Sequence, residues 1–261
     1  MPAIRTDAIA ESLVSLCHAL GAEDREWAIL GEGNASVVVD DDTFYVKTSG
    51  ARMANLTDKG IVQMSSSPLV ELIESSREMT DLQIAELLKL SIVQETELMP
   101  TVEALSHAYL LTLDGVNAVG HSHVLSINSL LCSDAGWSAM KSGGRLFPDE
   151  IVVCGAYPCC VPYTDPGLPL ARAIRLAVQK FIQHHSVVPQ TIYLQNHGFI
   201  ALGRSTDEVI AITAMAEKAA KIMLGAFACG VPRFLTPEDV SKIATRPDEK
   251  FRQRTLGLTT E

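Results

Sequence analysis

The chain has 261 residues, a net charge of −10 and 47% hydrophobic residues, and these values exclude several classes of protein. The hydrophobic fraction is enough for a sizeable core and too high for a disordered chain. Basic residues are scattered through an acidic sequence, so neither nucleic acid nor a membrane surface is an expected partner. No apolar run approaches the ~18 residues of a membrane helix. Charges interrupt the N-terminal apolar positions, unlike in a signal peptide.

The six cysteines are irregularly spaced and include the adjacent pair Cys159-Cys160. A disulfide framework would show regular spacing in a short secreted chain, so reduced thiols are expected. We therefore predict a cytoplasmic protein.

The first part of the chain predicts helices around a hairpin. Residues 6–20 have a Thr/Asp cap signal and helical apolar spacing, and stop at Gly21. Strands are expected at 37–39 and 44–47, joined by a turn at Asp40 to Asp42. Two more helices follow, at 81–93 with Asp81 as cap and at 101–113 after Pro100.

The middle of the chain alternates short elements. A strand is predicted at 116–121 and a helix at 124–132. A loop containing glycine and serine is expected over 134–149, followed by strands at 152–157 and 159–163.

The last part predicts a helix over 168–185 and another over 206–228. Between them, TIYLQNHGFIALG has two strand-like runs broken at Asn196-His197-Gly198. After Pro237 a polar tail is expected to form a final helix and then fray. Because no regular βαβ rhythm is present, we predict a single domain over 1–261, with 237–261 as its tail and a largely antiparallel sheet covered by helices.

Two histidines flank one serine in the stretch AVGHSHVLSIN. In a strand, residues i and i+2 point to the same face, so His121 and His123 would project side by side. Catalytic zinc sites commonly have three protein ligands. His197 is the best third candidate, because Gly198 lets the backbone bend or approach closely there. Histidines with purely structural roles are the alternative.

Glu103 falls in the first turn of a predicted apolar helix. The helix dipole favours a carboxylate there, which is one explanation. The other is a general acid/base beside a metal. His107 lies one turn later on the same face, so a supporting role is expected for it.

Glycine, asparagine, serine and lysine gather at both ends of the predicted hairpin, in GEGNASVVV and VKTSGARM. Backbone N–H groups at glycine turns, with Lys47 and neighbouring polar side chains, suit an anionic group. Ordinary turn chemistry explains the pattern equally well. GEGN is neither a dinucleotide nor a Walker pattern.

Six motifs occur in one order: GEGNAS, VKTSG, PTVEALSH, HSH, VPYTDPGLPLA and NHG. Together they resemble the class II aldolase/adducin family over about residues 10 to 230. The resemblance implies a three-layer α/β/α fold with a central, mostly antiparallel sheet. It also implies a homotetramer with active sites at subunit interfaces.

The resemblance further implies a divalent metal held by His121, His123 and His197, most commonly zinc, with manganese or cobalt as alternatives. Glu103 matches the family's acid/base, and Tyr163 is the candidate for orienting the aldehyde end. The positions matching the substrate-phosphate site are Asn34, Lys47, Ser49, Gly50 and Thr101.

By this resemblance the protein is a metal-dependent aldolase that cleaves a ketose phosphate reversibly through a metal-stabilised enediolate. Alternatives on the same scaffold are a decarboxylase of a 3-oxo sugar-acid phosphate, a pentulose-phosphate 4-epimerase and an adducin-like binding domain. Glu103 favours a lyase over an epimerase. Fuculose-phosphate aldolases carry two serines where this chain has Thr101-Val102, so one phosphate-facing hydroxyl is lost.

Overall fold

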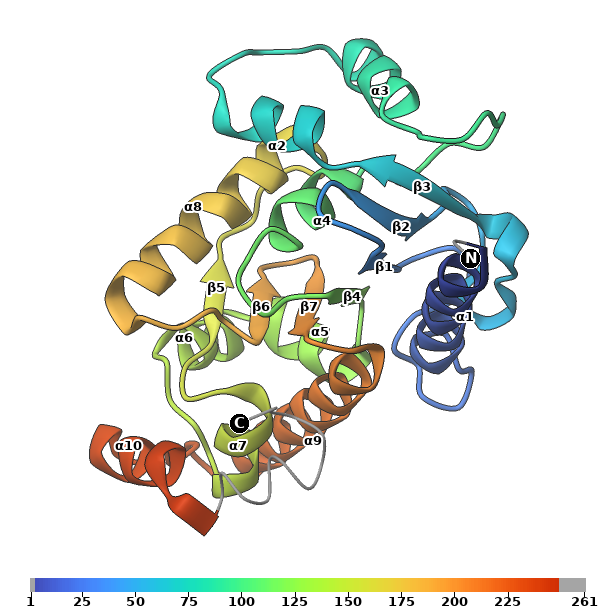
Figure 1. Cartoon of the computed structure of the whole chain (residues 1–261). Helices are drawn as coiled ribbons and strands as arrows, with labels where there is room; N and C mark the ends of the chain where they lie inside the picture. Colours follow the sequence, from blue (N-terminus) through green and yellow to red (C-terminus); the bar gives the residue numbers. More distant parts are fainter. Residues whose placement is uncertain (1–2, 249–261) are drawn as a thin grey trace.

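A seven-stranded sheet forms the centre of the computed structural model, which describes residues 3–248 (Figure 1). The strand order is β3-β2-β1-β4-β7-β6-β5, and only the β5–β6 pair is parallel. The strands are β1 (Asn34–Val38), β2 (Thr43–Lys47), β3 (Ile61–Ser65), β4 (Ala118–Ser122), β5 (Cys159–Val161), β6 (Thr191–Leu194) and β7 (Gly198–Gly203).

Helices cover both faces of this sheet, with α10 packed on α7. One face carries α1 (Ala3–Leu20), α5 (Leu125–Leu131), α6 (Asp134–Lys141), α7 (Pro148–Cys154) and α9 (Thr206–Cys229). The other carries α2 (Ser67–Glu74), α3 (Asp81–Leu90), α4 (Ala104–Leu110) and α8 (Leu168–His185). The remaining helices are α10 (Pro237–Thr245) and two short 3₁₀ turns, Met53–Asn55 and Asp58–Gly60.

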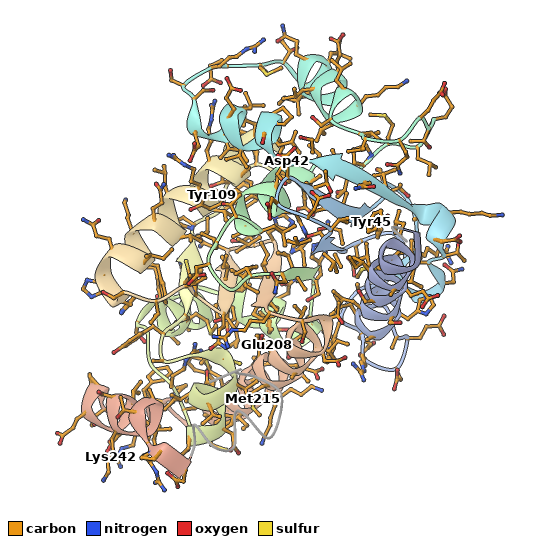
Figure 2. The ribbon with its side chains drawn as sticks, viewed as in Figure 1. Asp42, Tyr45, Tyr109, Glu208, Met215 and Lys242 are labelled. Carbon is orange, nitrogen blue, oxygen red and sulfur yellow. The ribbon has the colours of Figure 1, made fainter. Side chains whose placement is uncertain are left out.

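The side chains of β7 illustrate how the sheet serves two cores. Phe199 and Ala201 face the layer that contains α9, whereas Ile200 and Leu202 face the layer that contains α8. Successive strand residues point to opposite faces, so a sheet buried on both sides reads as a continuous apolar run. Side chains fill the space between the sheet and both layers (Figure 2). The predicted three-layer α/β/α fold is confirmed.

Most predicted elements are present, and α8 has the predicted bounds. Two predictions in the middle of the chain are wrong. The expected loop at 134–149 contains α6, which begins where the Ser133 side chain accepts a hydrogen bond from the Gly136 N–H. The expected strand at 152–157 is largely α7, because Pro148 and the acidic first turn outweigh the β-branched pair Val152-Val153.

Smaller differences concern element ends. Thr80, not Asp81, caps α3, in a capping box with Gln83. The helix predicted at 101–113 is the shorter α4, whose N-cap is Glu103. Both β3 and α2 lie in a stretch for which no element was predicted. The final helix is confirmed as α10, and the predicted frayed end lies outside the described residues.

All six cysteines are free thiols. Among residues 3–248, no helix combines the length and hydropathy that crossing a membrane requires.

The strands β1, β4 and β7 are adjacent at the middle of the sheet, and their register determines what meets at one end. Asn34 on β1 lies directly opposite His121 on β4. Residues opposite each other on antiparallel strands have neighbouring side chains on one face. Glu103, at the start of α4, lies over this pair.

Candidate metal centre

His121 occupies β4 and is fully buried. Its Nδ1 lies 3.1 Å from the carbonyl oxygen of Phe199 on the neighbouring β7. A carbonyl only accepts hydrogen bonds, so Nδ1 carries the proton, and Nε2 of the neutral ring presents a lone pair. Burial lowers the pKa of His121 to about 4, although the nearby Glu103 acts in the opposite direction. The low pKa favours the neutral ring.

His123 follows the end of β4 and is held by its backbone and its ring. Its backbone N–H donates to the carbonyl of Trp27 at 2.8 Å. Its Nδ1 lies 2.9 Å from Oε2 of Glu32, an acceptor when ionised, so Nε2 again presents the lone pair. Glu32 was not predicted from sequence, because GEGN was interpreted as a turn and an anion-binding loop. An acidic residue between two glycines was the available signal.

His197 lies in the tight β6–β7 turn, where its N–H donates to the Leu194 carbonyl at 3.1 Å. Asn196 adopts a positive φ of 53°, which asparagine tolerates better than most residues. Asn128 on α5 donates to the His197 carbonyl at 3.0 Å. A Cβ on Gly198 would lie 2.7 Å from Cδ2 of His123 and 2.9 Å from Cε1 of His121. The predicted close backbone approach at Gly198 is therefore present.

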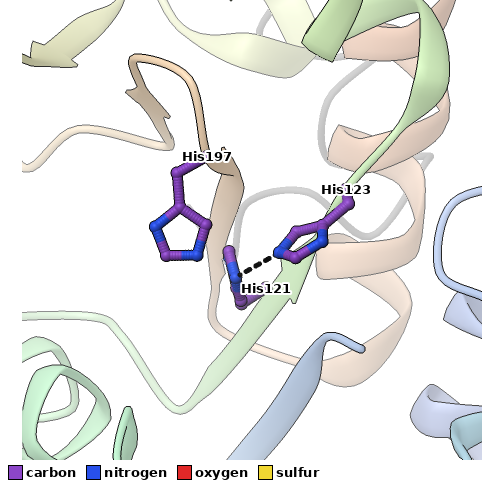
Figure 3. Close-up of side chains that lie close together, drawn as sticks. All are labelled: His121, His123 and His197. Atoms are coloured by element: carbon purple, nitrogen blue, oxygen red, sulfur yellow. Dashed lines mark hydrogen bonds between the residues drawn. The ribbon is translucent and has the colours of Figure 1, made fainter. Parts of the chain in front are cut away.

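The three rings converge, as Figure 3 shows, and one ligand atom from each lies within 4.8 Å of the others. Nε2 of His121 and Nε2 of His123 are 3.1 Å apart. Two nitrogens bound to one tetrahedral zinc at ~2.0–2.1 Å would be roughly 3.3 Å apart. With both Nδ1 atoms protonated, two lone pairs face each other at this distance. A cation between them removes their repulsion, so the donor set fits a divalent metal.

The carboxylate of Glu103 lies beside two of the three imidazoles, those of His121 and His197. Oε1 lies 3.2 Å from Nε2 of His197, and Oε2 lies 3.5 Å from Nε2 of His121. Asn34 donates a hydrogen bond to Oε2 from its side-chain amide. Burial alone would raise the pKa of the Glu103 carboxyl, but His121, His197 and the Asn34 hydrogen bond hold it well below its usual range. Glu103 is therefore a carboxylate in a site of imidazoles.

His107 supports this arrangement from one turn along α4. Its Nδ1 lies 2.6 Å from the hydroxyl of Ser36 on β1. Burial lowers the pKa of His107 to about 3, so the ring is neutral. Its Nε2 is buried and has no hydrogen-bond partner among the described residues.

Apart from Asn34 on β1, the residues predicted to bind phosphate lie on two joined segments. Thr48 bridges to Pro100, and the Ser49 N–H donates to the Met99 carbonyl at 2.8 Å, which joins VKTSG to PTVE. Lys47 is buried, with Nζ 3.3 Å from the Gly31 carbonyl. The remaining positions of the predicted set are the exposed Ser49 and Gly50, the half-buried Thr101 and the buried Asn34.

Two predicted site residues make contacts that sequence did not foresee. Asn34 donates to Glu103, so its amide orients that carboxylate, and its contact with phosphate stays a prediction. Tyr163 lies just beyond β5 and is 56% exposed. Its hydroxyl donates to Asp165 at 3.1 Å, and its catalytic role also stays a prediction.

Comparison with known proteins gives one family. A sequence model of the class II aldolase and adducin N-terminal domain matches residues 11–224. No functionally curated protein matches the chain by sequence.

Solved structures with this fold are similar at low sequence identity. YgbL from Klebsiella pneumoniae, described as a putative aldolase/epimerase/decarboxylase, has a TM-score of 0.68 at 19% identity and covers 91% of this chain and 98% of its own. An L-fuculose 1-phosphate aldolase has a TM-score of 0.65 at 20% identity, covering 94% and 96%. The N-terminal class II aldolase domain of a conserved Thermoplasma acidophilum protein has a TM-score of 0.64 at 22% identity, covering 82% and 92%. These likenesses establish the fold.

Replacing Gly198 by alanine should separate the histidines. The new methyl group would overlap His121 and His123, so we expect destabilisation of about 1–3 kcal/mol, typical of overpacking, and weaker metal binding. Urea unfolding and metal titration measure the two effects. Gly225→Ala is the matched control, because a Cβ there meets open space and α9 should gain stability. Equal effects of the two substitutions would contradict this account.

Acid should destabilise the protein in part through His107. In the unfolded chain the histidine takes up a proton near pH 6.5, whereas in the folded protein it does so only at about 3. The free energy of unfolding is therefore unaffected by this group above about pH 6.5 and falls as the pH drops toward 3, by roughly 1.5 kcal/mol between pH 6.5 and 5. His107→Gln cannot titrate and should lack this component in urea unfolding. The same exchange at the exposed His184 should keep it.

Proposed function

The chain belongs to the class II aldolase and adducin family, and from this we propose that it is a metal-dependent carbon–carbon lyase that cleaves a ketose phosphate reversibly. The observation that carries the proposal is the convergence of three imidazoles under one carboxylate, Glu103. Relatives with the fold include an L-fuculose 1-phosphate aldolase. A small sugar or sugar phosphate is accordingly the proposed substrate. Six free thiols fit action in the reducing cytoplasm.

His121, His123 and His197 would hold the metal through nitrogen lone pairs. Nitrogen ligands suit zinc, which we propose, with manganese or cobalt as alternatives. When bound, a divalent ion supplies Lewis-acid stabilisation of the negative charge that develops on substrate oxygens.

Glu103 is the proposed acid/base. Its low carboxyl pKa keeps it ionised and able to accept a proton. The Asn34 amide fixes Oε2, which orients the carboxylate over the imidazoles. In the reverse direction the carboxylate would remove a proton from the carbon beside the ketone carbonyl. In the cleavage direction the substrate hydroxyl loses its proton as the carbon–carbon bond breaks, and Glu103, once it has taken up a proton, would deliver it to the same carbon.

The phosphate end is assigned to the joined segments beside the cluster. Gly50 has a positive φ of 76° and nothing within 4 Å of its Cβ position, so its backbone is open to a ligand. Lys47, Ser49 and Thr101 add an ammonium and two hydroxyls to this region. Charged and backbone donors of this kind suit a phosphate. Tyr163, exposed beyond β5, is the proposed contact for the aldehyde fragment.

Exposed apolar side chains lie close in sequence to two residues of the site, Glu32 and His123. Ile29 and Leu30 precede Glu32 and are 57% and 71% exposed, and Leu125 follows His123 and is 61% exposed. Large apolar side chains gathered at one site mark an interaction surface. They support a homo-oligomer, by resemblance a tetramer, in which a neighbouring subunit covers the site.

A decarboxylase of a 3-oxo sugar-acid phosphate is the second candidate. Val102 stands half-exposed between Thr101 and Glu103, where fuculose-phosphate aldolases have a phosphate-facing serine. Valine in place of this serine removes a hydroxyl that could bind phosphate, which supports an anion-binding site different from that of fuculose-phosphate aldolases. A pentulose-phosphate 4-epimerase is less favoured because Glu103 is retained. The retained histidines argue against a purely adducin-like binding domain.

Metal analysis tests the centre itself. Purified wild-type protein should carry about one divalent ion per chain, and His123→Ala should lose most of it, because the variant keeps two of the three ligands. His184→Ala, an exposed histidine of α8, should leave metal content unchanged. Retention of full metal content by His123→Ala, measured by mass spectrometry, would remove this assignment.

Replacing Glu103 by glutamine should slow turnover by about 10²-fold or more, as loss of a general acid/base does. Metal content should be retained, because the three histidines are untouched. Deuterium exchange of the ketone product's α-hydrogen, followed by NMR, isolates the proton transfer and should slow equally. Glu97→Gln, at an exposed carboxylate of the preceding loop, is the control. Normal exchange in Glu103→Gln would exclude Glu103 as the base.

A further inference from the structure

We propose that Glu32 is a positioning residue of the metal centre, which fixes the ring orientation and tautomer of His123 and strengthens metal binding. The proposal rests on the metal-dependent function above. Glu32 lies 91 positions before His123 in sequence, and the fold brings its carboxylate to the far nitrogen of that ring.

The contact determines which nitrogen of His123 is available. Oε2 of Glu32 lies 2.9 Å from Nδ1. An ionised carboxylate only accepts hydrogen bonds, so the proton of the neutral ring stays on Nδ1 and the lone pair stays on Nε2. Nε2 is the atom that lies 3.1 Å from Nε2 of His121. A carboxylate behind a metal-bound imidazole also makes that imidazole a stronger ligand.

Glu32 is itself held in place. Its second oxygen, Oε1, accepts the Ile29 N–H at 2.7 Å, and its own N–H donates to the Ile29 carbonyl at 3.1 Å. Leu30 adopts a positive φ of 53° inside this turn. The carboxylate is therefore ordered before a metal arrives, which reduces the entropy cost of using it.

The loop from Trp27 to Glu32 contacts His123 twice, through the Trp27 carbonyl and through the Glu32 carboxylate. Gly33 allows the chain after this loop to pass close to the backbone of His121. It has a positive φ of 70°, and a Cβ there would lie 2.8 Å from the His121 carbonyl oxygen. The motif Gly31-Glu32-Gly33 thus passes close to β4 and places the Glu32 carboxylate beside Nδ1 of His123.

His121 obtains the same tautomer from a neutral group, the Phe199 carbonyl. Glu32 differs because it adds a negative charge next to the proposed cation. A partly exposed ion pair usually contributes little to stability. The Glu32 side chain is 32% exposed, so its effect should appear in metal affinity and not in the free energy of unfolding.

The test measures the zinc dissociation constant of the full chain by competition with a chelator at fixed pH. Glu32→Ala should bind zinc about 10- to 100-fold more weakly, the usual effect of losing such a partner. Glu32→Gln keeps an acceptor oxygen but loses the charge, so it should lose less. Glu26→Gln, the same loss of charge at the exposed residue immediately before this loop, should bind like wild type.

Nitrogen NMR of the metal-free protein gives a second measurement. In wild type the His123 proton should reside on Nδ1, and in Glu32→Ala it should move largely to Nε2. The midpoint of urea unfolding should stay close to that of wild type, which separates positioning from a structural defect.

The outcomes distinguish the two proposals. If wild type binds zinc and Glu32→Ala binds it equally well, the role of Glu32 is overturned and the metal centre stands. If Glu32→Ala binds more weakly but no sugar phosphate is cleaved, the positioning role is supported and the lyase assignment fails. If wild type binds no divalent ion, both are overturned.

Discussion

The structure depends on holding three imidazoles and a carboxylate together at one end of the sheet. Nε2 of His121 and Nε2 of His123 face each other at 3.1 Å with their protons directed elsewhere. Such a donor set could hold a cation, and the contacts around it fix the orientation of the rings. The pairing of β1, β4 and β7 supplies the rigid part, and Gly198 supplies the space. Flexible side chains alone would not keep these lone pairs converged.

The sequence predicts those elements whose signals are local. The helix α8 has helical periodicity, a proline in its first turn and two histidines in its last turn, and its bounds follow from pattern alone. The helix α7 was missed because two β-branched residues favour a strand, while its stability comes from contacts that a pattern does not contain. Arg145, fully buried, bonds Glu150 in the first turn of α7 and the carbonyl of Cys154 in the last. Tertiary contacts of this kind override local propensity.

The site residues also differ in whether local sequence patterns predict them. A period of two relates His121 and His123, and a break between strands marks His197, so the pattern and the family resemblance together predict the ligands, and the fold brings the three rings together. The partners of these residues come from distant segments. Asn34 was assigned to phosphate, yet strand register sets it opposite His121 and within reach of Glu103. The contact of Glu32 with His123 could not be predicted from the sequence either, because no spacing rule connects a turn before β1 to a ring beyond β4.

The charges of the site bear on the charge of the proposed substrate. Under the proposed function, the carboxylates of Glu103 and Glu32 would offset the two positive charges of one divalent cation held by the three histidines. The anionic end of the proposed substrate would then need a cation of its own. Lys47 meets this need: it is buried beside the Gly31 carbonyl, and Glu103 is among the charges that act on it. Burial lowers the pKa of Lys47, so its ammonium gains most from an anion placed next to it. A metal centre and a buried lysine with separate roles therefore fit the proposed substrate, a sugar phosphate that is anionic at one end and polar at the other.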